Sequence, residues 1–290
     1  MTDYSLFLGC IIPLRFPFLE ASSRKVLDLL GVRCETLKGA SCCPDPVGVQ
    51  SVSFKAWLYI AARNLALAEE EGRDVLTLCS GCFETLKTAR EILLQSPELM
   101  EEVNEALKSI DREFKGEVDV VHLVEAIYRV GPGKVRNMVV RELDAGVAVH
   151  YGCHLLRPSE HLRFDDPENP RKLDELVEAL GARSVEYEYK HLCCGATVGN
   201  VKRDLAHEYV KWKLKFIARS GAECMVVACP FCFAQYDLGQ VELSRRGERF
   251  NLPVFYYPEM LGLALGCSYR ELGLHMHRTS VEPFLRKHIL

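Results

Sequence analysis

Ten of the thirteen cysteines in this chain form two sets of five that share the same order and similar spacing. Each set begins with a Gly-Cys pair, continues with two adjacent cysteines and ends with a Cys-x-x-Cys motif. Thiolates are the ligands that zinc and iron–sulfur clusters accept. The spacing therefore predicts a metal centre in each half, with the following ligands: Cys10, Cys42, Cys43, Cys79 and Cys82 in the first set, and Cys153, Cys193, Cys194, Cys229 and Cys232 in the second.

The number of thiols in each set indicates the kind of metal centre. A structural zinc takes four ligands, and so does a cubane iron–sulfur cluster. Ligation by thiolates alone favours iron and sulfide over hard cations. A cluster of unusual shape with more than four protein ligands fits the count best. For a single Cys-x-x-Cys or Cys-Cys pair, zinc binding, thiol redox chemistry and packing remain alternatives.

Composition sets limits on the class of protein. The chain has 290 residues, is 48% hydrophobic and carries a formal charge of −4, without the basic excess typical of nucleic-acid binding. No apolar run approaches the roughly 20 residues that span a bilayer, and residues 1–10 do not resemble a signal peptide. An odd number of cysteines cannot all pair as disulfides, and thiols persist in reducing compartments. We therefore expect a cytoplasmic protein without a membrane span.

Short apolar runs alternate with longer amphipathic stretches along the whole chain. This alternation predicts an α/β fold with largely parallel sheets flanked by helices. The expected strands are Tyr4–Leu8, Val75–Leu78, Val118–His122, Val147–Tyr151, Met225–Ala228 and Val254–Tyr257. The expected helices are Leu19–Leu30, Trp57–Glu71, Glu98–Ile110, Lys172–Leu180 and Arg203–Ala218, with Gly72 as a stop signal after the second.

The two halves of the chain are related to each other. The Gly-Cys, Cys-Cys and Cys-x-x-Cys motifs recur at offsets of 143, 151 and 150 residues (153−10, 193−42 and 229−79), each in a similar context of apolar residues. This pattern indicates a duplication and predicts two pseudo-symmetric half-domains, residues 1–135 and 136–290. The connection is expected within residues 129–146.

The cysteines follow the expected strands in a way that indicates a common site. Gly-Cys and Cys-x-x-Cys each come at the carboxyl end of an apolar strand, and the crevice beyond such ends is the usual ligand site of open α/β sheets. A Cys-x-x-Cys motif at the start of a helix places two sulfurs near one centre, where amide groups favour thiolates. We therefore expect each set to converge at the carboxyl edge of its own sheet.

These motifs resemble the duplicated cysteine-rich CCG domain found in the B subunit of heterodisulfide reductase and in related iron–sulfur subunits of glycolate, lactate and quinone-linked oxidoreductases. The resemblance covers essentially the whole chain and is carried by Phe7–Cys10, Gly39–Pro44, Ala61–Leu65, His150–His154 and Cys229–Cys232. It implies two non-cubane [4Fe–4S] clusters, one held by each five-cysteine set, which face each other across a pocket. It further implies reduction of the coenzyme M–coenzyme B disulfide to two thiols. Electrons would come from the ferredoxin-like [4Fe–4S] C subunit and the flavin-containing, electron-bifurcating A subunit of heterodisulfide reductase.

Other residues near the motifs are candidates for supporting roles. His154 is a candidate proton donor, whereas His150 and His191 are expected to support ligands or to pack. Arg15, Lys202 and Arg203 follow the motifs and are candidates for binding an anionic substrate or for surface charge, and Cys34, Cys224 and Cys267 are expected to pack. Two alternative functions stay open: an electron-relay component of a larger oxidoreductase, and a related iron–sulfur component of sulfur metabolism.

Overall fold

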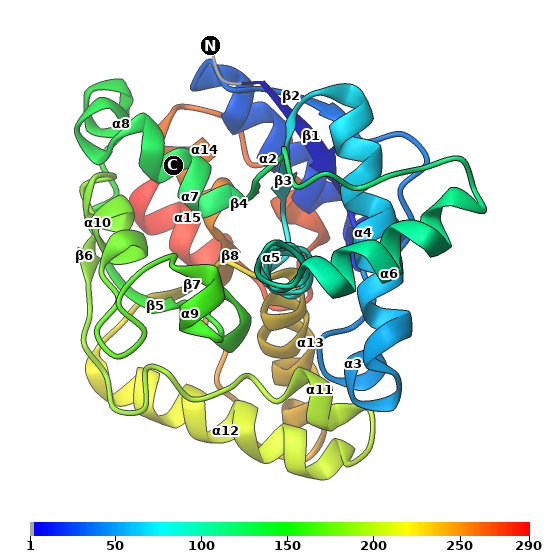
Figure 1. The fold of residues 1–290 in the computed structure, drawn as a ribbon. Helices are drawn as coiled ribbons and strands as arrows, with labels where there is room; N and C mark the ends of the chain where they lie inside the picture. Colours follow the sequence, from blue (N-terminus) through cyan, green and yellow to red (C-terminus); the bar gives the residue numbers. More distant parts are fainter. Residues whose placement is uncertain (1–2) are drawn as a thin grey trace.

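The computed structural model describes residues 3–290 and contains two four-stranded parallel sheets, one in each half of the chain (Figure 1). Helices flank both sheets, so the predicted α/β class is confirmed. The strands are β1 (Asp3–Phe7), β2 (Arg33–Thr36), β3 (Asp74–Thr77) and β4 (Val120–His122) in the first half, and β5 (Gly146–His150), β6 (Arg183–Ser184), β7 (Cys224–Val227) and β8 (Val254–Tyr256) in the second.

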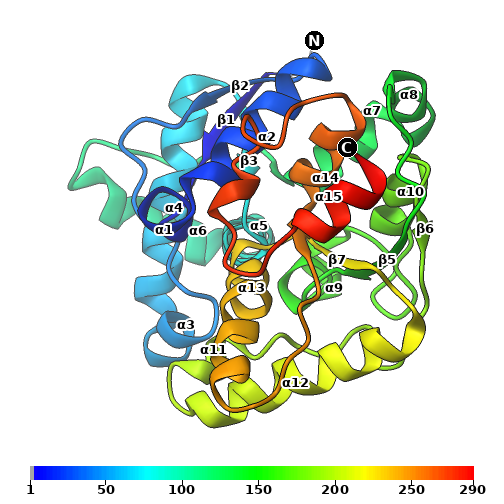
Figure 2. The ribbon, with the colours of Figure 1, turned by 180° about the vertical axis from the view of Figure 1, so that it is seen from behind.

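The helices connect successive strands and cover the sheets (Figures 1 and 2). Those of the first half are α1 (Ile11–Arg15), α2 (Pro17–Leu29), α3 (Gly48–Val52), α4 (Phe54–Glu71), α5 (Ser80–Gln95), α6 (Pro97–Lys108), α7 (Leu123–Val130) and α8 (Pro132–Met138). Those of the second half are α9 (Ser159–Leu162), α10 (Lys172–Glu178), α11 (Ala196–Gly199), α12 (Arg203–Ser220), α13 (Pro230–Arg245), α14 (Tyr257–Ala264) and α15 (Glu282–His288), with short 3₁₀ turns η1 (Cys153–Leu155) and η2 (Leu274–Met276). Among residues 3–290, no helix is both long and apolar enough to cross a membrane.

The order of the strands is the same in both sheets, which agrees with the predicted duplication. The first sheet has the order β2-β1-β3-β4 and the second β6-β5-β7-β8. In each sheet the chain runs outward from a central strand first to one side and then to the other. The switch point therefore lies between β1 and β3 in one half and between β5 and β7 in the other, where ligands bind in open sheets of this kind.

The ends of the helices follow local sequence signals. Helix α4 begins after Ser53, whose hydroxyl accepts a hydrogen bond from the Ala56 amide, and ends at Gly72 in the left-handed conformation, at φ 65°. The stop predicted at Gly72 is therefore confirmed, although the helix starts three residues before Trp57. Its counterpart α12 ends in the same way at Gly221, with φ 76°.

The sequence analysis gave no bounds for β2 and β6, which are edge strands. No residue of either strand is fully buried, so neither shows the apolar run that marks an inner strand. Strand β6 has only two residues and pairs with β5 alone. Both strands depend on pairing with a central neighbour, which local sequence does not record.

Each half of the chain packs one of its last helices against the other half. Helix α7, which follows β4, packs on α10, and α14, which follows β8, packs on α2 (Figure 2). The Tyr128 hydroxyl of α7 donates to Glu175 Oε2 of α10 at 2.7 Å. This reciprocal packing joins the two halves. The division at 135/136 stays a prediction, and that position falls inside α8.

Candidate functional site

The Gly-Cys and Cys-x-x-Cys motifs lie at the carboxyl ends of the central strands, next to the switch points. Cys10 follows β1 and Cys79 follows β3, and these two strands are hydrogen-bonded neighbours. Cys153 and Cys229 follow β5 and β7 in the same relation. Cys79 and Cys229 are the N-cap residues of α5 and α13. The fold therefore brings both ends of each motif set to one edge of its sheet.

The five thiols of the first set form a continuous cluster. Cys43 Sγ lies 3.0 Å from Cys82 Sγ, and Cys42 Sγ lies 3.0 Å from the Cys43 carbonyl oxygen. Cys10 hydrogen-bonds to Cys42, and Cys79 to Cys82. Cys43, Cys79 and Cys82 are buried, whereas Cys42 is exposed. The adjacent pair thus lies in a loop that closes the cluster from outside.

The second set is arranged in the same way. Cys153 Sγ lies 3.9 Å from Cys193 Sγ, and the Gly195 amide donates to Cys193 Sγ at 3.3 Å. Cys194 hydrogen-bonds to Cys232, which also contacts Cys229. Each predicted set of five is therefore together in space.

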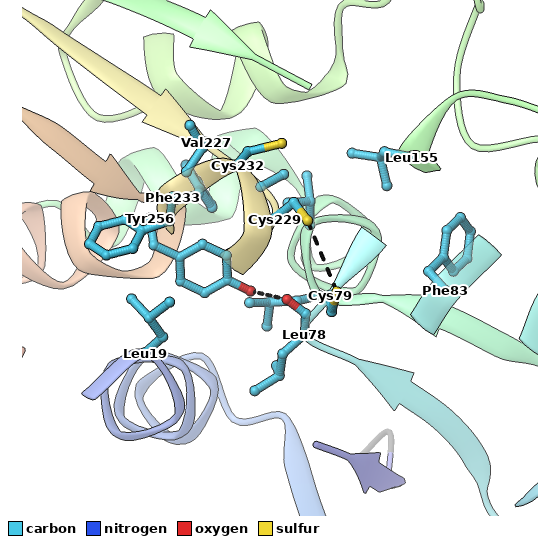
Figure 3. Close-up of a cluster of buried hydrophobic side chains, with 14 of the residues drawn as sticks. Leu19, Leu78, Cys79, Phe83, Leu155, Val227, Cys229, Cys232, Phe233 and Tyr256 are labelled. Atoms are coloured by element: carbon cyan, nitrogen blue, oxygen red, sulfur yellow. Dashed lines mark hydrogen bonds between the residues drawn. The ribbon is translucent and has the colours of Figure 1, made fainter. Parts of the chain in front are cut away.

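The two sets are in contact with each other. Cys79 Sγ and Cys229 Sγ are 4.0 Å apart, at the facing starts of α5 and α13 (Figure 3). Beside them, the Tyr256 hydroxyl of β8 donates to the Leu78 carbonyl at 2.6 Å, which ties the second sheet to the residue before Cys79. The ten thiols therefore form one continuous region between the halves.

Hydrogen bonds between the thiols favour the thiolate form at a few positions. Hydrogen bonds with Cys42 and Cys82 lower the pKa of Cys43 to about 5. Hydrogen bonds from Cys153 and Cys194 hold the pKa of Cys193 well below its usual value. Thiolate is the form that binds metals, and each set contains at least one cysteine whose pKa is lowered in this way.

Two glycines leave room for sulfur where a side chain would intrude. Gly9 has φ +66°, and a Cβ placed there would lie 2.8 Å from Cys82 Sγ. Gly152 has φ +78°, and its Cβ would lie 3.3 Å from Cys232 Sγ. The glycine of each Gly-Cys motif is thus needed both for its left-handed backbone and for the close approach of a thiol.

A pocket of about 110 Å³ opens onto the second set of cysteines. All five cysteines of that set line it, together with Phe231 and His154. The first half contributes Asp45, Pro46, Ser80 and Gly81 to the lining. The family resemblance predicts two clusters that face each other across a pocket, but the cysteines of this pocket come from the second set.

His154, the candidate proton donor, lines the pocket and has a carboxyl group behind it. Its Nδ1 lies 3.9 Å from Glu84 Oε2, and Glu84 is almost fully buried on α5. Burial raises the pKa of Glu84 to about 8, and the negative charge of Asp45 acts in the same direction. The sequence analysis missed Glu84, because the packing of η1 on α5 that joins it to His154 depends on how the halves meet.

The remaining candidates lie in varied surroundings. His150 is fully buried and neither of its ring nitrogens has a hydrogen-bond partner, whereas His191 is exposed. Arg15 and Lys202 are exposed and are not among the residues that line the pocket, and Arg203 pairs with Glu242. The three cysteines outside the sets, Cys34, Cys224 and Cys267, lie in or against the hydrophobic core, as the packing prediction requires.

The residues present fit an iron–sulfur group by the chemistry of their donors. All thirteen cysteines are free thiols, and ten of them converge. Within residues 3–290, no three His, Cys, Asp or Glu side chains are arranged to hold a single metal ion. The fit therefore depends on the thiol donors, on the two glycines that admit them and on unpartnered polar atoms of buried side chains beside the second set.

Comparison with known proteins identifies the family. The cysteine-rich domain CCG matches residues 4–87 and again residues 147–237. The chain is 42% identical to the B subunit of the ferredoxin:CoB-CoM heterodisulfide reductase of Methanosarcina mazei, over 99% of this chain and 97% of that protein. It is 31% identical to the 8-methylmenaquinol:fumarate reductase membrane anchor subunit of Wolinella succinogenes, over 94% and 95% of the two chains.

A solved structure shares the fold. A hypothetical protein from Helicobacter pylori superposes with a TM-score of 0.75 and 18% identity, covering 97% of this chain and 52% of that one. The two CCG matches, the 42% identity over nearly full length and the repeated four-stranded sheets agree. The chain therefore belongs to the family of heterodisulfide reductase B subunits, with two cysteine-rich CCG domains.

Proposed function

We propose that this chain is the subunit of a heterodisulfide reductase that reduces a disulfide, and that its substrate is the coenzyme M–coenzyme B disulfide. The observation that carries the proposal is the pocket lined by all five cysteines of the second set, in a chain 42% identical to a B subunit of such an enzyme. The overall change consumes two electrons and two protons, breaks one S–S bond and releases two thiols.

Each five-cysteine set would hold one non-cubane [4Fe–4S] cluster. The ligands would be Cys10, Cys42, Cys43, Cys79 and Cys82 for the first, and Cys153, Cys193, Cys194, Cys229 and Cys232 for the second. The clusters would supply the electrons for S–S cleavage and stabilise the charge of the two product sulfurs. The contact between Cys79 and Cys229 supports electron transfer from the first set to the second, since their sulfurs are 4.0 Å apart.

The protein groups around the pocket have separate tasks. Phe231 and the backbone of Gly81 and Gly152 form the walls against which a substrate packs. Helix α5 starts at Ser80, which lines the pocket, and the partial positive charge of a helix start would favour the sulfur that becomes negative. His154, with Glu84 behind it, holds a proton at the edge of the pocket for delivery to a product thiolate.

The similarity to B subunits of heterodisulfide reductase suggests the other subunits of that enzyme as partners. The ferredoxin-like [4Fe–4S] C subunit of heterodisulfide reductase would deliver electrons, and its flavin-containing, electron-bifurcating A subunit would supply them. A reducing cytoplasm suits a chain with thirteen free thiols. A relay of electrons without a substrate is a second candidate, favoured by the 31% identity to a component of a fumarate reductase.

Single-turnover reduction distinguishes these two functions. The anaerobically purified chain is reduced chemically, freed of reductant and mixed with the coenzyme heterodisulfide, and released thiols are counted. We expect up to two thiols for each pair of electrons stored. Cys224→Ser, which alters a core thiol outside both sets, serves as the control. If no thiol appears while partner iron–sulfur proteins still oxidise the reduced chain, the relay is supported and the reductase is rejected.

A further inference from the structure

Buried polar atoms without partners gather beside the second set of cysteines. His150 at the end of β5 and Tyr236 on α13 are buried, and both His150 nitrogens and the Tyr236 hydroxyl have no hydrogen-bond partner. A buried donor without an acceptor destabilises the fold, so such groups call for an explanation. A neutral imidazole has one N–H donor, and the Tyr236 hydroxyl is a second donor. Two unpaired donors beside thiols indicate that a ligand with acceptor atoms belongs there.

The fold places both side chains near the second set. Tyr236 lies one helical turn after Cys232 on α13, hence on the same face of that helix. Burial raises the pKa of Tyr236, and the negative charges of Cys194 and Cys232 act in the same direction. His150 is three residues before Cys153, and its ring packs edge-on against the Tyr236 ring with centroids 5.2 Å apart. The two side chains therefore lie together beside the second set.

A third buried polar residue near the second set is a lysine. Lys213 on α12 has no exposed surface, and its Nζ donates to the Lys190 carbonyl at 2.8 Å and to the Tyr189 carbonyl. Burial lowers the pKa of Lys213 to about 7, while the negative charges of Cys232, Cys194 and Cys193 act in the opposite direction and favour its protonated form. Lys213 therefore holds in place the loop that leads to the adjacent cysteine pair.

The first half has apolar or neutral residues at all three equivalent positions. Since β1 and β5 have five residues each, His150 corresponds to Phe7, and since α5 and α13 have sixteen each, Tyr236 corresponds to Leu86. Lys213 corresponds to Asn64, because α4 and α12 both have eighteen residues.

The equivalent polar group of the first half is already committed. Asn64 uses its amide oxygen to accept from the Ser41 amide at 3.0 Å and has no formal charge. The two halves share strand order and cysteine positions, so these three positions are a chemical difference between two otherwise corresponding sites.

We propose that His150, Tyr236 and Lys213 direct hydrogen bonds and positive charge at the group held by the second set, and that they raise its reduction potential above that of the first. Hydrogen bonds to cluster sulfurs and nearby positive charge stabilise the reduced, more negative state. Electrons would then collect at the set that lines the pocket. The inference rests on the proposed function, because it assumes that both sets hold clusters.

The test compares Tyr236→Phe with wild type in a redox titration followed by electron paramagnetic resonance on the anaerobic full chain. Tyr257→Phe is the matched control, since Tyr257 is also fully buried but burial alone raises its pKa, without a contribution from any cysteine. The signal of the second set is the one that Cys194→Ser removes. His150→Phe, which copies Phe7, is the second variant.

We expect wild type to show two separate midpoint potentials, with the second set higher. Tyr236→Phe is expected to lower only that potential, by about a tenfold change in the ratio of reduced to oxidised form, or about 59 mV for one electron. Two clusters with equal potentials, or variants that leave the second potential unchanged, would overturn this inference alone. A chain without iron or sulfide would overturn the proposed function, and this inference with it.

Discussion

Replacement of Gly9 by alanine is expected to remove the metal centre of the first half while the second half keeps its own. The backbone at Gly9 has φ +66°, which costs an L-residue about 1–2 kcal/mol. The new Cβ would also lie 2.8 Å from Cys82 Sγ, well inside the roughly 3.5–4.0 Å of an ordinary contact between carbon atoms. Cys82 must therefore move by several tenths of an ångström.

The variant Gly72→Ala separates the cost of the backbone conformation from the effect of the close contact with Cys82. Gly72 has nearly the same backbone conformation, with φ +65°, but a Cβ there meets no atom within 4 Å. Both variants are expected to lower the melting temperature by about 2–6 °C, at roughly 2–3 °C per kcal/mol for a chain of this size. Gly152→Ala is expected to disturb its cysteine set less than Gly9→Ala and more than Gly72→Ala, because its Cβ would lie 3.3 Å from Cys232 Sγ.

Iron bound per chain after anaerobic purification is the decisive measurement for these three variants. We expect Gly9→Ala to retain about half of the wild-type iron, Gly152→Ala to retain more, and Gly72→Ala to retain all of it. If Gly9→Ala binds as much iron as Gly72→Ala, the close approach of Cys82 to Gly9 is not needed for the metal centre of the first set, and the predicted role of this glycine is refuted.

Two further predictions concern stability. Tyr256→Phe leaves the buried Leu78 carbonyl without its 2.6 Å hydrogen bond, which should cost about 1–3 kcal/mol in the free energy of unfolding. An unchanged denaturation midpoint would argue against this link between the halves. Burial alone would raise the pKa of Glu71, but hydrogen bonds from Ser5 and Arg73 outweigh it and hold the pKa below its usual value. The carboxylate therefore stabilises the fold above pH 4.5, its unperturbed pKa, and this contribution disappears as the pH falls through the lower pKa of the folded state. Glu71→Gln should melt earlier than wild type at pH 7, with a difference that narrows below pH 4.5; a difference that is independent of pH would refute the assignment.

The sequence was sufficient to predict the strands that carry the cysteines. Strands β3 and β7 are short apolar runs that end just before Cys79 and Cys229, so composition and motif point to the same place. The duplication was visible because both motifs recur at nearly constant offset, and the identical strand order bears it out. Such patterns can be recognised in the sequence because the burial of each strand requires a run of apolar residues within that strand itself.

The features that sequence could not provide all depend on how the halves meet. The contact of Cys79 with Cys229, the pairing of His154 with Glu84 and the location of the pocket involve residues from both halves. No periodicity within one half specifies the orientation of the other. The sequence pattern makes the two sets look equivalent, whereas the pocket is lined by the cysteines of the second set, and His150 and Tyr236 have no polar counterpart in the first.

Analysis of metal and sulfide shows whether each five-cysteine set holds one cluster. Wild-type chain, Cys43→Ser, Cys194→Ser and the control Cys224→Ser are purified without oxygen, and iron, zinc and acid-labile sulfide are measured on each. Two four-iron clusters predict about eight irons and eight sulfides in wild type and control, and about four of each in Cys43→Ser and Cys194→Ser. Zinc in place of iron, or full iron content in either of those two variants, would contradict the assignment of one cluster to each five-cysteine set.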